Sequence, residues 1–398
     1  MLSVPPLFLG LGANIDYELC WDEESFAALL ARNGVTSTDG DTLLHRILKI
    51  MLSGKGAEFS VPRQEDLEMI YSAFTYQETL GGTAARAALI ALLLDKNVRL
   101  HVVDEPSKYR NLLPVGVDFV WDEQSHVTSS PHVIIQYPKG ANLKVGEHIF
   151  ITQRANRIIL TGDAANSTLP LSCNLPMYFR QAVVVLMSGF NAMDDKTELL
   201  VRLRDVEKAA AAAAAETFIV YEDAAFHNEE FHDLVLESAE KFAHCLSFNE
   251  DELSTRLRRD VDFKDCGMIA DALTELSGSF PDKTILIHTA DWSAIGGKRK
   301  DDLLPALICA VATSAARYVQ GDAVTVLDID KMRAKISGGV RSAFVTSLES
   351  LSGWNFIETP RLQITNPTTI GLGDSFIGGF VSAVVDLARL EFGIGDYR

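Results

Sequence analysis

Short apolar runs alternate along this chain with longer stretches of helical periodicity. The runs predict buried strands at residues 7–12, 98–103, 182–189, 217–222, 245–249 and 284–289, and the periodic stretches predict helices at 22–32, 83–94, 195–215 and 303–319. A strand followed by a helix, repeated, is typical of a mostly parallel sheet that helices cover on both faces. The pattern therefore predicts an α/β fold.

One region departs from this alternation of strands and helices. Between about residues 117 and 160 the chain reads as strand, turn, strand, in the segments VDFVWDE, HVIIQYPKG and EHIFITQRANRIIL, with Ser, Pro and Gly at the turns. This antiparallel character predicts a second, smaller sheet, which we interpret as a lid.

Composition narrows the choice of partner. The 398 residues include 36 Lys and Arg against 54 Asp and Glu, a formal charge of −18. Nucleic acid and anionic membrane surfaces both demand an excess of basic residues, so neither is expected as a partner. Any anionic ligand must meet a local basic pocket.

The location of the protein is predicted from its cysteines and its apolar runs. The five cysteines are scattered, without a close pair, which favours a reducing compartment. The first residues lack the basic lead of a signal peptide, and no uncharged apolar run reaches the ~18 residues that indicate a membrane helix. We expect a cytoplasmic protein without a membrane partner.

The segment GLGDSF carries the chemistry that stands out most. Gly371 and Gly373 precede an apolar run that reads as a helix, and Asp374 lies between the glycines and that run. Backbone N–H groups at such a helix start can hold an anion, and a neighbouring carboxylate can accept the proton of an attacking hydroxyl. The alternative is a tight turn followed by an N-capping aspartate.

GLGDSF resembles the Gly-x-Gly-Asp signature of the ribokinase-like sugar kinases. Six further segments are similar, in the same order, to those of one branch, the ADP-dependent glucokinase and phosphofructokinase family: GANID (12–16), LGGTAARAAL (80–89), QRANRIIL (153–160), LMSGFN (186–191), NEDE (249–252) and IHTADW (287–292). The resemblance spans nearly the whole chain.

The resemblance implies a ribokinase-like three-layer sandwich with a central, mostly parallel sheet and a smaller discontinuous α/β lid. We expect the large nucleotide-binding catalytic domain at residues 1–15, 41–64, 81–104 and 161–398, and the lid at 16–40, 65–80 and 105–160. The implied activity is that of a kinase of glycolysis. The terminal phosphoryl group of ADP moves, with Mg²⁺, to a hydroxyl of a hexose or sugar phosphate of the glucose or fructose 6-phosphate type.

Three points stay open at this stage. One alternative is a kinase of another acceptor, such as a nucleoside or a sugar 1-phosphate, and another is a catalytically silent protein that binds sugar or nucleotide. The chain is expected to be a monomer or a small homo-oligomer.

The resemblance also assigns roles to individual residues. Asp374 is the expected catalytic base, Gly371 and Gly373 form the anion hole, and Arg154 contacts phosphate. Sugar contacts are expected from Asn14, Asp16, Gly81, Gly82 and Asn156, nucleotide contacts from Asn249, His288, Thr289 and Arg157, and metal contacts from Glu222 and Glu252.

Structural alternatives accompany several of these roles. Asp16 could form an Asx-turn, Gly81 and Gly82 could serve helix packing, and the arginines could be plain surface residues or ion-paired ones. The two glutamates could be solvated, and His288 could be a structural residue.

Two positions depart from the family pattern. Thr83 stands where an amide is expected, and Val220 stands where the family has a histidine two residues before the glutamate. With Val220 there, Glu222 is expected to be oriented by backbone and water alone, and its hold on the metal to be looser.

Overall fold

The computed structural model describes residues 6–226, 228–362, 364, 368 and 370–391. The chain forms two compact units, a large unit of Met1–Ala13, Gly82–Ser125 and Thr168–Arg398 and a small unit of Asn14–Gly81 and His126–Ser167. In the described part of the chain, no helix is long and apolar enough to cross a bilayer.

The large unit is built on a sheet of nine strands among the described residues. Their order is β16 (Asn355–Glu358), β15 (Trp292–Gly297), β14 (Thr284–His288), β13 (Cys245–Asn249), β12 (Phe218–Glu222), β11 (Val184–Met187), β1 (Leu7–Gly10), β5 (Val98–His101) and β6 (Asp118–Val120). Every pairing from β6 to β14 is parallel, whereas β15 pairs antiparallel with both β14 and β16. The predicted parallel sheet is confirmed.

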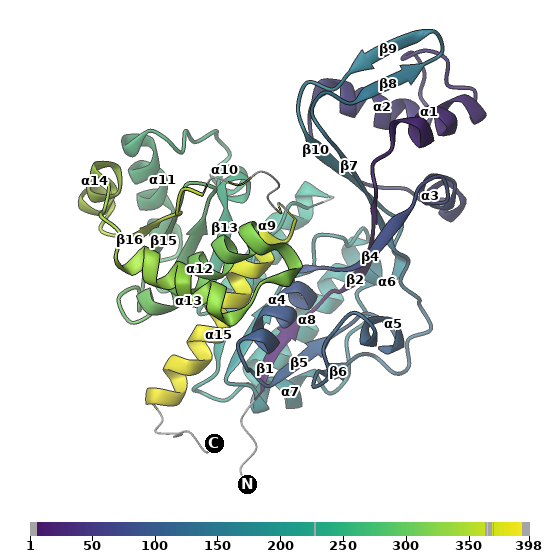
Figure 1. Cartoon of the computed structure of the whole chain (residues 1–398). Coiled ribbons are helices and arrows are strands. Elements are labelled where there is room, and N and C mark those ends of the chain that lie inside the picture. Colours follow the sequence, from purple (N-terminus) through teal and green to yellow (C-terminus); the bar gives the residue numbers. More distant parts are fainter. Residues whose placement is uncertain (1–5, 227, 363, 365–367, 369, 392–398) are drawn as a thin grey trace. The chain divides into compact units, whose positions relative to one another are not determined.

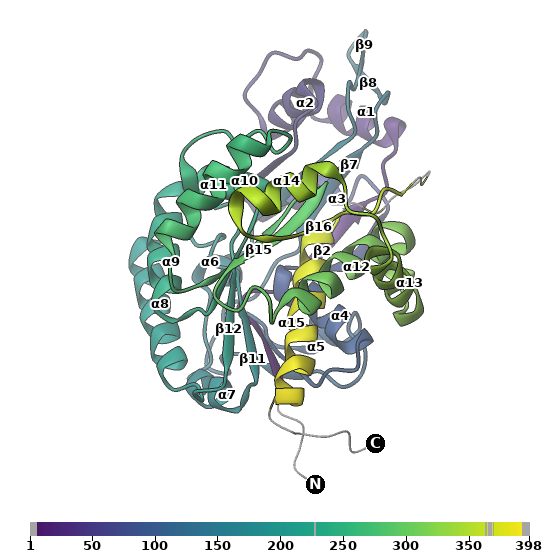
Figure 2. The ribbon, with the colours of Figure 1, turned by 90° about the vertical axis from the view of Figure 1, so that its left-hand side faces the viewer.

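Helices cover this sheet on both faces (Figure 2). One side carries α7 (Leu175–Gln181), α8 (Lys196–Ala211), α9 (Glu229–Phe242) and α11 (Cys266–Ser279), and the other carries α4 (Thr83–Leu93), α12 (Leu304–Gln320) and α15 (Leu372–Glu391). The remaining helices are α5 (Ser107–Arg110), α6 (Ala164–Thr168), α10 (Glu250–Leu257), η1 (Gly321–Ala323), α13 (Val326–Ser337) and α14 (Ala343–Ser352). The three-layer arrangement expected from the alternating pattern is present.

The small unit has a sheet of its own, mixed in direction. Its order is β3 (Ala57–Ser60), β10 (Asn156–Thr161), β7 (His132–Tyr137), β2 (Asn14–Leu19) and β4 (Tyr76–Gly81). A separate hairpin of β8 (Asn142–Val145) and β9 (His148–Ile151) packs on α1 (Figure 1). The other helices of this unit are α1 (Glu23–Arg32), α2 (Leu43–Ser53) and α3 (Gln64–Tyr71).

The two faces of the small sheet differ in polarity. Val133, Ile135 and Tyr137 on β7 join a buried core to which the helices contribute Phe26, Ile47 and Leu67, among others. Because side chains alternate along a strand, the residues between them, such as His132 and Gln136, lie on the opposite face. That face is largely polar.

The unit boundaries differ from the expected ones mainly in three places. Residues 161–167, with most of α6, belong to the small unit. Residues 41–64 belong to the small unit, because α2 supplies its core and β3 pairs with β10. Residues 105–125 belong to the large unit, because β6 pairs with β5. The segment VDFVWDE is therefore an edge strand of the large sheet, and residues 148–160 form two strands instead of one.

Two adjacent glycines allow α15 to pack closely against its neighbours. A Cβ on Gly378 would come within 3.0 Å of Ala87 Cα on α4, and a Cβ on Gly379 within 2.6 Å of Thr313 Oγ1 on α12. Real Cβ atoms essentially never come as close as 2.6 Å, so position 379 must lack a side chain, and a Cβ at position 378 would press on the α4 backbone. The GG pair fixes where α15 lies against these two helices.

We predict that Gly379→Val lowers the free energy of unfolding by about 2 kcal/mol or more, because the added side chain overpacks the contact with α12. Gly278→Ala is the matched control, since no atom lies within 4 Å of a Cβ built on that exposed residue of α11. It should stabilise the protein by about 0.5–1 kcal/mol. Urea unfolding of the three proteins measures both, and equal stabilities would contradict the packing argument.

His101, at the end of β5, is a fully buried histidine that burial keeps neutral. Its Nδ1–H donates to the carbonyl oxygen of Leu11 at 2.6 Å, and within the described residues Nε2 has no hydrogen-bond partner. Desolvation lowers the pKa of this imidazole to about 4.

Between pH 6.5 and 4 the unfolded chain therefore binds a proton at His101 that the folded chain does not bind. Stability falls as pH drops through this window, by about 3 kcal/mol at its lower end for this one residue. We predict that His101→Asn, which keeps an N–H donor, reduces the fall measured by urea unfolding at pH 7 and pH 4.5. Identical pH dependences would show that His101 does not titrate in this way.

Candidate active site

The start of α15 presents the backbone amides of a first helical turn. Gly371 has a φ of +68°, and Ser375 donates its N–H to the Gly371 carbonyl at 3.0 Å, so the helix begins at Leu372. The amides of the first turn have no acceptor within their own helix. Asp374 is the third residue of the helix and not its N-cap, so the capping alternative does not describe it.

A guanidinium lies beside this helix start. Arg86 Nε, from α4, is 3.8 Å from Asp374 Oδ2, and Arg86 is buried. A Cβ on Gly371 would come within 2.9 Å of Arg86 Nη1, a second reason for glycine there. Amides, a guanidinium and a carboxylate thus meet at one point, where a phosphoryl group could be held and a proton accepted.

Arg86 was not among the site residues predicted from the sequence. The only available signal was a single charged residue in the otherwise apolar stretch TAARAALIALL, which begins directly after Gly82. Gly82 itself has a φ of +83° and precedes the first residue of α4. Its positive φ gives a structural reason for glycine that is separate from the helix packing of the alternative, and its contact with sugar stays a prediction.

Glu222 and His288 meet across the carboxyl ends of β12 and β14. His288 Nε2 is 3.0 Å from Glu222 Oε1. Burial by itself would lower the pKa of His288, but the nearby carboxylates of Glu222, Glu250 and Asp374 raise it overall. Glu222 is therefore not oriented by backbone and water alone. That expectation was wrong, because a strand two places away in the sheet supplies the donor.

Asn249 and Glu252 form a capping box at the start of α10. Glu252 Oε1 accepts from Asn249 Nδ2 at 2.7 Å and Oε2 accepts from Asn249 N at 2.8 Å, while Asn249 Oδ1 accepts from Glu252 N. Burial, followed by the charges of Asp223 and Glu222, raises the pKa of Glu252 well above its usual range. NEDE thus has a local structural role in addition to any ligand it contacts.

The acidic residues at this edge fit a magnesium ion held through water and phosphate. Glu222 Oε2 is buried and, among the described residues, has no hydrogen-bond partner. No three His, Cys, Asp or Glu side chains of the described ranges are arranged to enclose a metal. Mg²⁺ commonly keeps several waters and binds one or two carboxylates plus substrate phosphates, which suits an open pair such as Glu222 and Glu252.

A second histidine–carboxylate pair lies next to Glu222. His232 Nε2, on α9, is 2.6 Å from Asp223 Oδ2, and Tyr221 donates its hydroxyl to Asp223 Oδ1 at 3.0 Å. Asp223 directly follows Glu222, which is weak evidence in the sequence for a role at the site. No sequence pattern indicated His232. The pair links the residue that follows β12 to helix α9.

Thr289 closes the turn between β14 and β15. Its hydroxyl donates to the Trp292 carbonyl at 2.7 Å and accepts from the N–H of Trp292 at 3.1 Å. The hydroxyl is thus engaged by the turn, and its expected contact with nucleotide stays a prediction.

In the small unit, Asn14 and Asp16 lie on strand β2 and not in a loop after the first strand. Asn14 Nδ2 donates to Asp16 Oδ1 at 2.5 Å, and any Cβ on Gly81 would overlap both side chains. Asp16 is therefore not the Asx-turn of the alternative interpretation. Gly81 is glycine because these two side chains cross β4 there.

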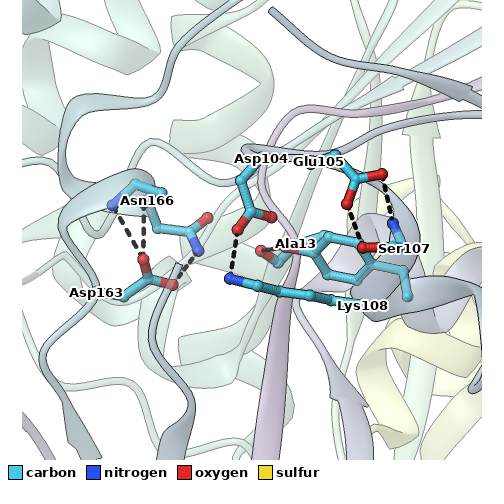
Figure 3. Close-up of polar contacts among 9 residues, drawn as sticks. Ala13, Asp104, Glu105, Ser107, Lys108, Asp163 and Asn166 are labelled. Carbon is cyan, nitrogen blue, oxygen red and sulfur yellow. Dashed lines mark hydrogen bonds and ion pairs between the residues drawn. The ribbon is translucent and has the colours of Figure 1, made fainter. Parts of the chain in front are cut away.

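His132 was also missed by the sequence analysis. It lies on β7 with Nδ1 at 4.0 Å from Asp16 Oδ1 and Nε2 at 3.6 Å from Asp163 Oδ2. Burial would lower its pKa, but these two carboxylates raise it overall. Asp163 in turn accepts from Asn166 Nδ2 at 2.6 Å and from two backbone amides at the start of α6 (Figure 3).

Asp104 and Lys108 of the large unit are ion-paired just after β5. Lys108 Nζ is 2.8 Å from Asp104 Oδ2, and Tyr109 donates its hydroxyl to the Ala13 carbonyl at 3.2 Å (Figure 3). Neither Asp104 nor Lys108 was among the site residues predicted from the sequence. Asp104 is buried while Lys108 keeps 41% of its side chain exposed, so the pair brings a positive charge to the surface near this end of β5.

The two arginines of QRANRIIL are both exposed on the small unit. Neither is ion-paired with a carboxylate of the described ranges, so there they are not the ion-paired arginines of the alternative, while plain surface arginines stay possible. Asn156, between them, donates to the Gly54 carbonyl at 3.1 Å and accepts from the Arg157 amide at 2.9 Å. Arg154 and Arg157 can therefore bind phosphate, whereas Asn156 has a structural task.

A comparison with protein-family models shows which family this chain belongs to. Residues 5–379 match the model of the ADP-specific phosphofructokinase/glucokinase conserved region. The chain belongs to the ADP-specific phosphofructokinase/glucokinase family. The predicted family and enzyme class, an ADP-dependent sugar kinase, are confirmed. No curated protein sequence matches the chain.

Solved structures of this family share the fold along the full length. A phosphofructokinase from Pyrococcus horikoshii OT3 with AMP is 18% identical, with 98% of this chain and 99% of that chain covered and a TM-score of 0.72. A last common ancestor of ADP-dependent phosphofructokinases from Methanosarcinales is 17% identical, with 97% and 95% covered and a TM-score of 0.73. An ADP-dependent kinase in complex with fructose 6-phosphate and ADPβS is 15% identical, with 98% and 95% covered and a TM-score of 0.70. At these identities the likeness establishes the ribokinase-like fold.

We predict that Asp374→Asn lowers kcat by at least ~10²-fold, the loss typical of removing a general base, while ADP still binds. The matched control is Asp386→Asn, an exposed aspartate further along the same helix that pairs with Lys96. The control should keep wild-type turnover. Steady-state kinetics and calorimetric ADP titration measure both effects, and turnover retained by Asp374→Asn would remove its assigned role.

Proposed function

We propose that this protein transfers the β-phosphoryl group of ADP to a hydroxyl of a sugar or sugar phosphate, with Asp374 as the catalytic base. The observation that carries the proposal is the start of α15, where Asp374 lies in the first helical turn, 3.8 Å from the Arg86 guanidinium. This arrangement can hold a phosphoryl group and accept a proton at neighbouring points.

The sugar hydroxyl oxygen attacks the β-phosphorus, its proton moves to the Asp374 carboxylate, and the bond from the β-phosphorus to the bridging oxygen breaks to release AMP. The first-turn amides of α15 and the Arg86 guanidinium stabilise the negative charge on the transferring group. When bound, Mg²⁺ neutralises charge on the phosphates, and Glu222 and Glu252 are the residues we assign to hold it.

The acceptor is assigned to the polar face of the small sheet. Asp16 is held in place by Asn14, at 2.5 Å, and flanked by His132, so its carboxylate is ordered before a sugar arrives. Arg154 and Arg157 are exposed cations on the same unit, suited to a phosphate group. We propose fructose 6-phosphate as the first acceptor to test, since similar solved structures include phosphofructokinases.

Three broader expectations remain predictions. The small unit is expected to act as a lid that excludes water, and its separate core and polar face support this. A cytoplasmic location is supported by five free cysteines. The state as a monomer or small homo-oligomer stays a prediction.

We predict that ADP supports phosphorylation and that ATP gives a rate near the enzyme-free background. The test measures AMP and phosphorylated sugar from each nucleotide with Mg²⁺, against fructose 6-phosphate, glucose, a nucleoside and a sugar 1-phosphate. The preparation must be free of adenylate kinase, which interconverts the nucleotides. A clear preference for ATP would contradict the proposed donor, and absence of turnover with every pair would favour a silent binding protein.

A further inference from the structure

The two carboxylates assigned to the metal are held by donors of different origin. Glu252 is held locally, because both of its oxygens accept hydrogen bonds from Asn249, three residues earlier. Glu222 has no such local donor. Its Oε1 accepts from His288 at 3.0 Å, and its Oε2 is buried without a hydrogen-bond partner among the described residues.

The parallel register places His288 within reach of Glu222. Glu222 is paired with Ser247 on β13, and Ser247 is paired with Leu286 on β14. His288 lies two residues beyond Leu286, so it shares the face of the sheet on which Glu222 lies. The imidazole reaches diagonally across β13 to the carboxylate.

The start of α15 fixes the other side of the imidazole. The ring of His288 packs against Phe376 with 4.8 Å between centroids, and its Cε1 lies 3.4 Å from a Cβ built on Gly373. His288 therefore contacts both the metal carboxylate and the helix that carries Asp374. A side chain held between these two elements can transmit the position of one to the other.

The strand that carries Glu222 supplies no donor of its own. Val220 is fully buried on the same face, and its cross-strand neighbours are Leu186 and Cys245. This row is apolar, so a hydrogen bond to Glu222 has to come from another strand.

We propose that His288 is a positioning residue for Glu222, because it supplies from β14 the donor that the apolar row around Val220 lacks. A carboxylate only accepts hydrogen bonds, so Nε2 of His288 carries the hydrogen and donates it to Oε1. Oε2 is then left to face the magnesium–nucleotide complex. The inference rests on the proposed function, in which Glu222 helps to hold Mg²⁺.

The decisive variant is His288→Phe, which keeps a flat ring against Phe376 and Gly373 but has no N–H. Calorimetric titration of ADP at a series of Mg²⁺ concentrations measures the effect on binding directly. Loss of a hydrogen bond behind a metal ligand typically costs 10–100-fold in metal affinity. We expect the Mg²⁺ concentration that half-saturates the metal-dependent part of ADP binding to rise by about that factor.

Two further variants separate positioning from a packing role. His288→Gln keeps a donor and should lie closer to the wild type, and Val220→His added to His288→Phe should restore most of the lost Mg²⁺ sensitivity. Neither result is expected if the ring only fills space. His148→Phe, the same exchange on the exposed hairpin strand β9, is the matched control and should match the wild type.

Glu222→Gln completes the test without a change at the histidine. It should raise the Mg²⁺ requirement, and its combination with His288→Phe should add little, because both act through one carboxylate. If His288→Phe does not fold, as judged by circular dichroism, the comparison of His288→Gln with Glu222→Gln and their double variant decides the same point.

The outcomes distinguish this inference from the proposed function. Wild-type-like Mg²⁺ dependence in His288→Phe, or full additivity with Glu222→Gln, would overturn the positioning role while the kinase assignment stands. A wild-type protein that binds no ADP at any Mg²⁺ concentration would overturn both. A shifted Mg²⁺ requirement that Val220→His reverses supports the inference, whichever sugar is the acceptor.

Discussion

The parallel register of β12, β13 and β14 is the constraint on which the candidate active site depends. It brings Glu222, Asn249 and His288 to the carboxyl edge of one sheet from positions up to 66 residues apart. Burying a carboxylate in such a sheet is costly unless it is hydrogen-bonded or paired. The structure meets this cost with one donor residue for each glutamate, Asn249 for Glu252 and His288 for Glu222. Among the described residues, the other oxygen of Glu222 has no hydrogen-bond partner, which suits the ligand role proposed for it.

Helix α15 links the stability of the large unit to its chemistry. Its glycine pair lets the backbone approach α4 and α12, and α4 in turn carries Arg86 to Asp374. A shift of α15 by even a fraction of an ångström would therefore change the distance between the Asp374 carboxylate, the proposed base, and the Arg86 guanidinium as well as the core packing. Small displacements of groups that must be held in one geometry can lower the rate of a reaction by large factors. Packing and catalysis rest here on the same contacts.

The sequence predicted what local pattern determines. The strand runs of the large sheet, its parallel direction and the helix start at GLGDSF all follow from periodicity and glycine placement, and the structure has them. Contacts between distant segments could not be predicted in this way. Arg86 beside Asp374, the His288–Glu222 bond and the Asp223–His232 pair each depend on register or on helix packing that no single stretch encodes.

The errors in the boundaries have the same origin. Residues 41–64 read as a helix and a short strand, and only the pairing of β3 with β10 shows that they complete the small sheet. VDFVWDE reads as a hairpin strand next to its neighbours in sequence, but it pairs with β5 instead. A strand's partner is a property of the whole fold, and a pattern of a few residues does not determine it.

The small unit shows how one sheet can serve both stability and recognition. Alternation along β7 sends Val133, Ile135 and Tyr137 into the core and leaves His132 on the polar face. There His132 lies between Asp16 and Asp163, and Asn14 holds Asp16 from its own strand. A side chain held from two sides loses little rotamer freedom when a ligand binds, which lowers the cost of binding. The polar face is thus ordered by the same strands whose other face forms the core, and this is the physical reason to assign the sugar to it.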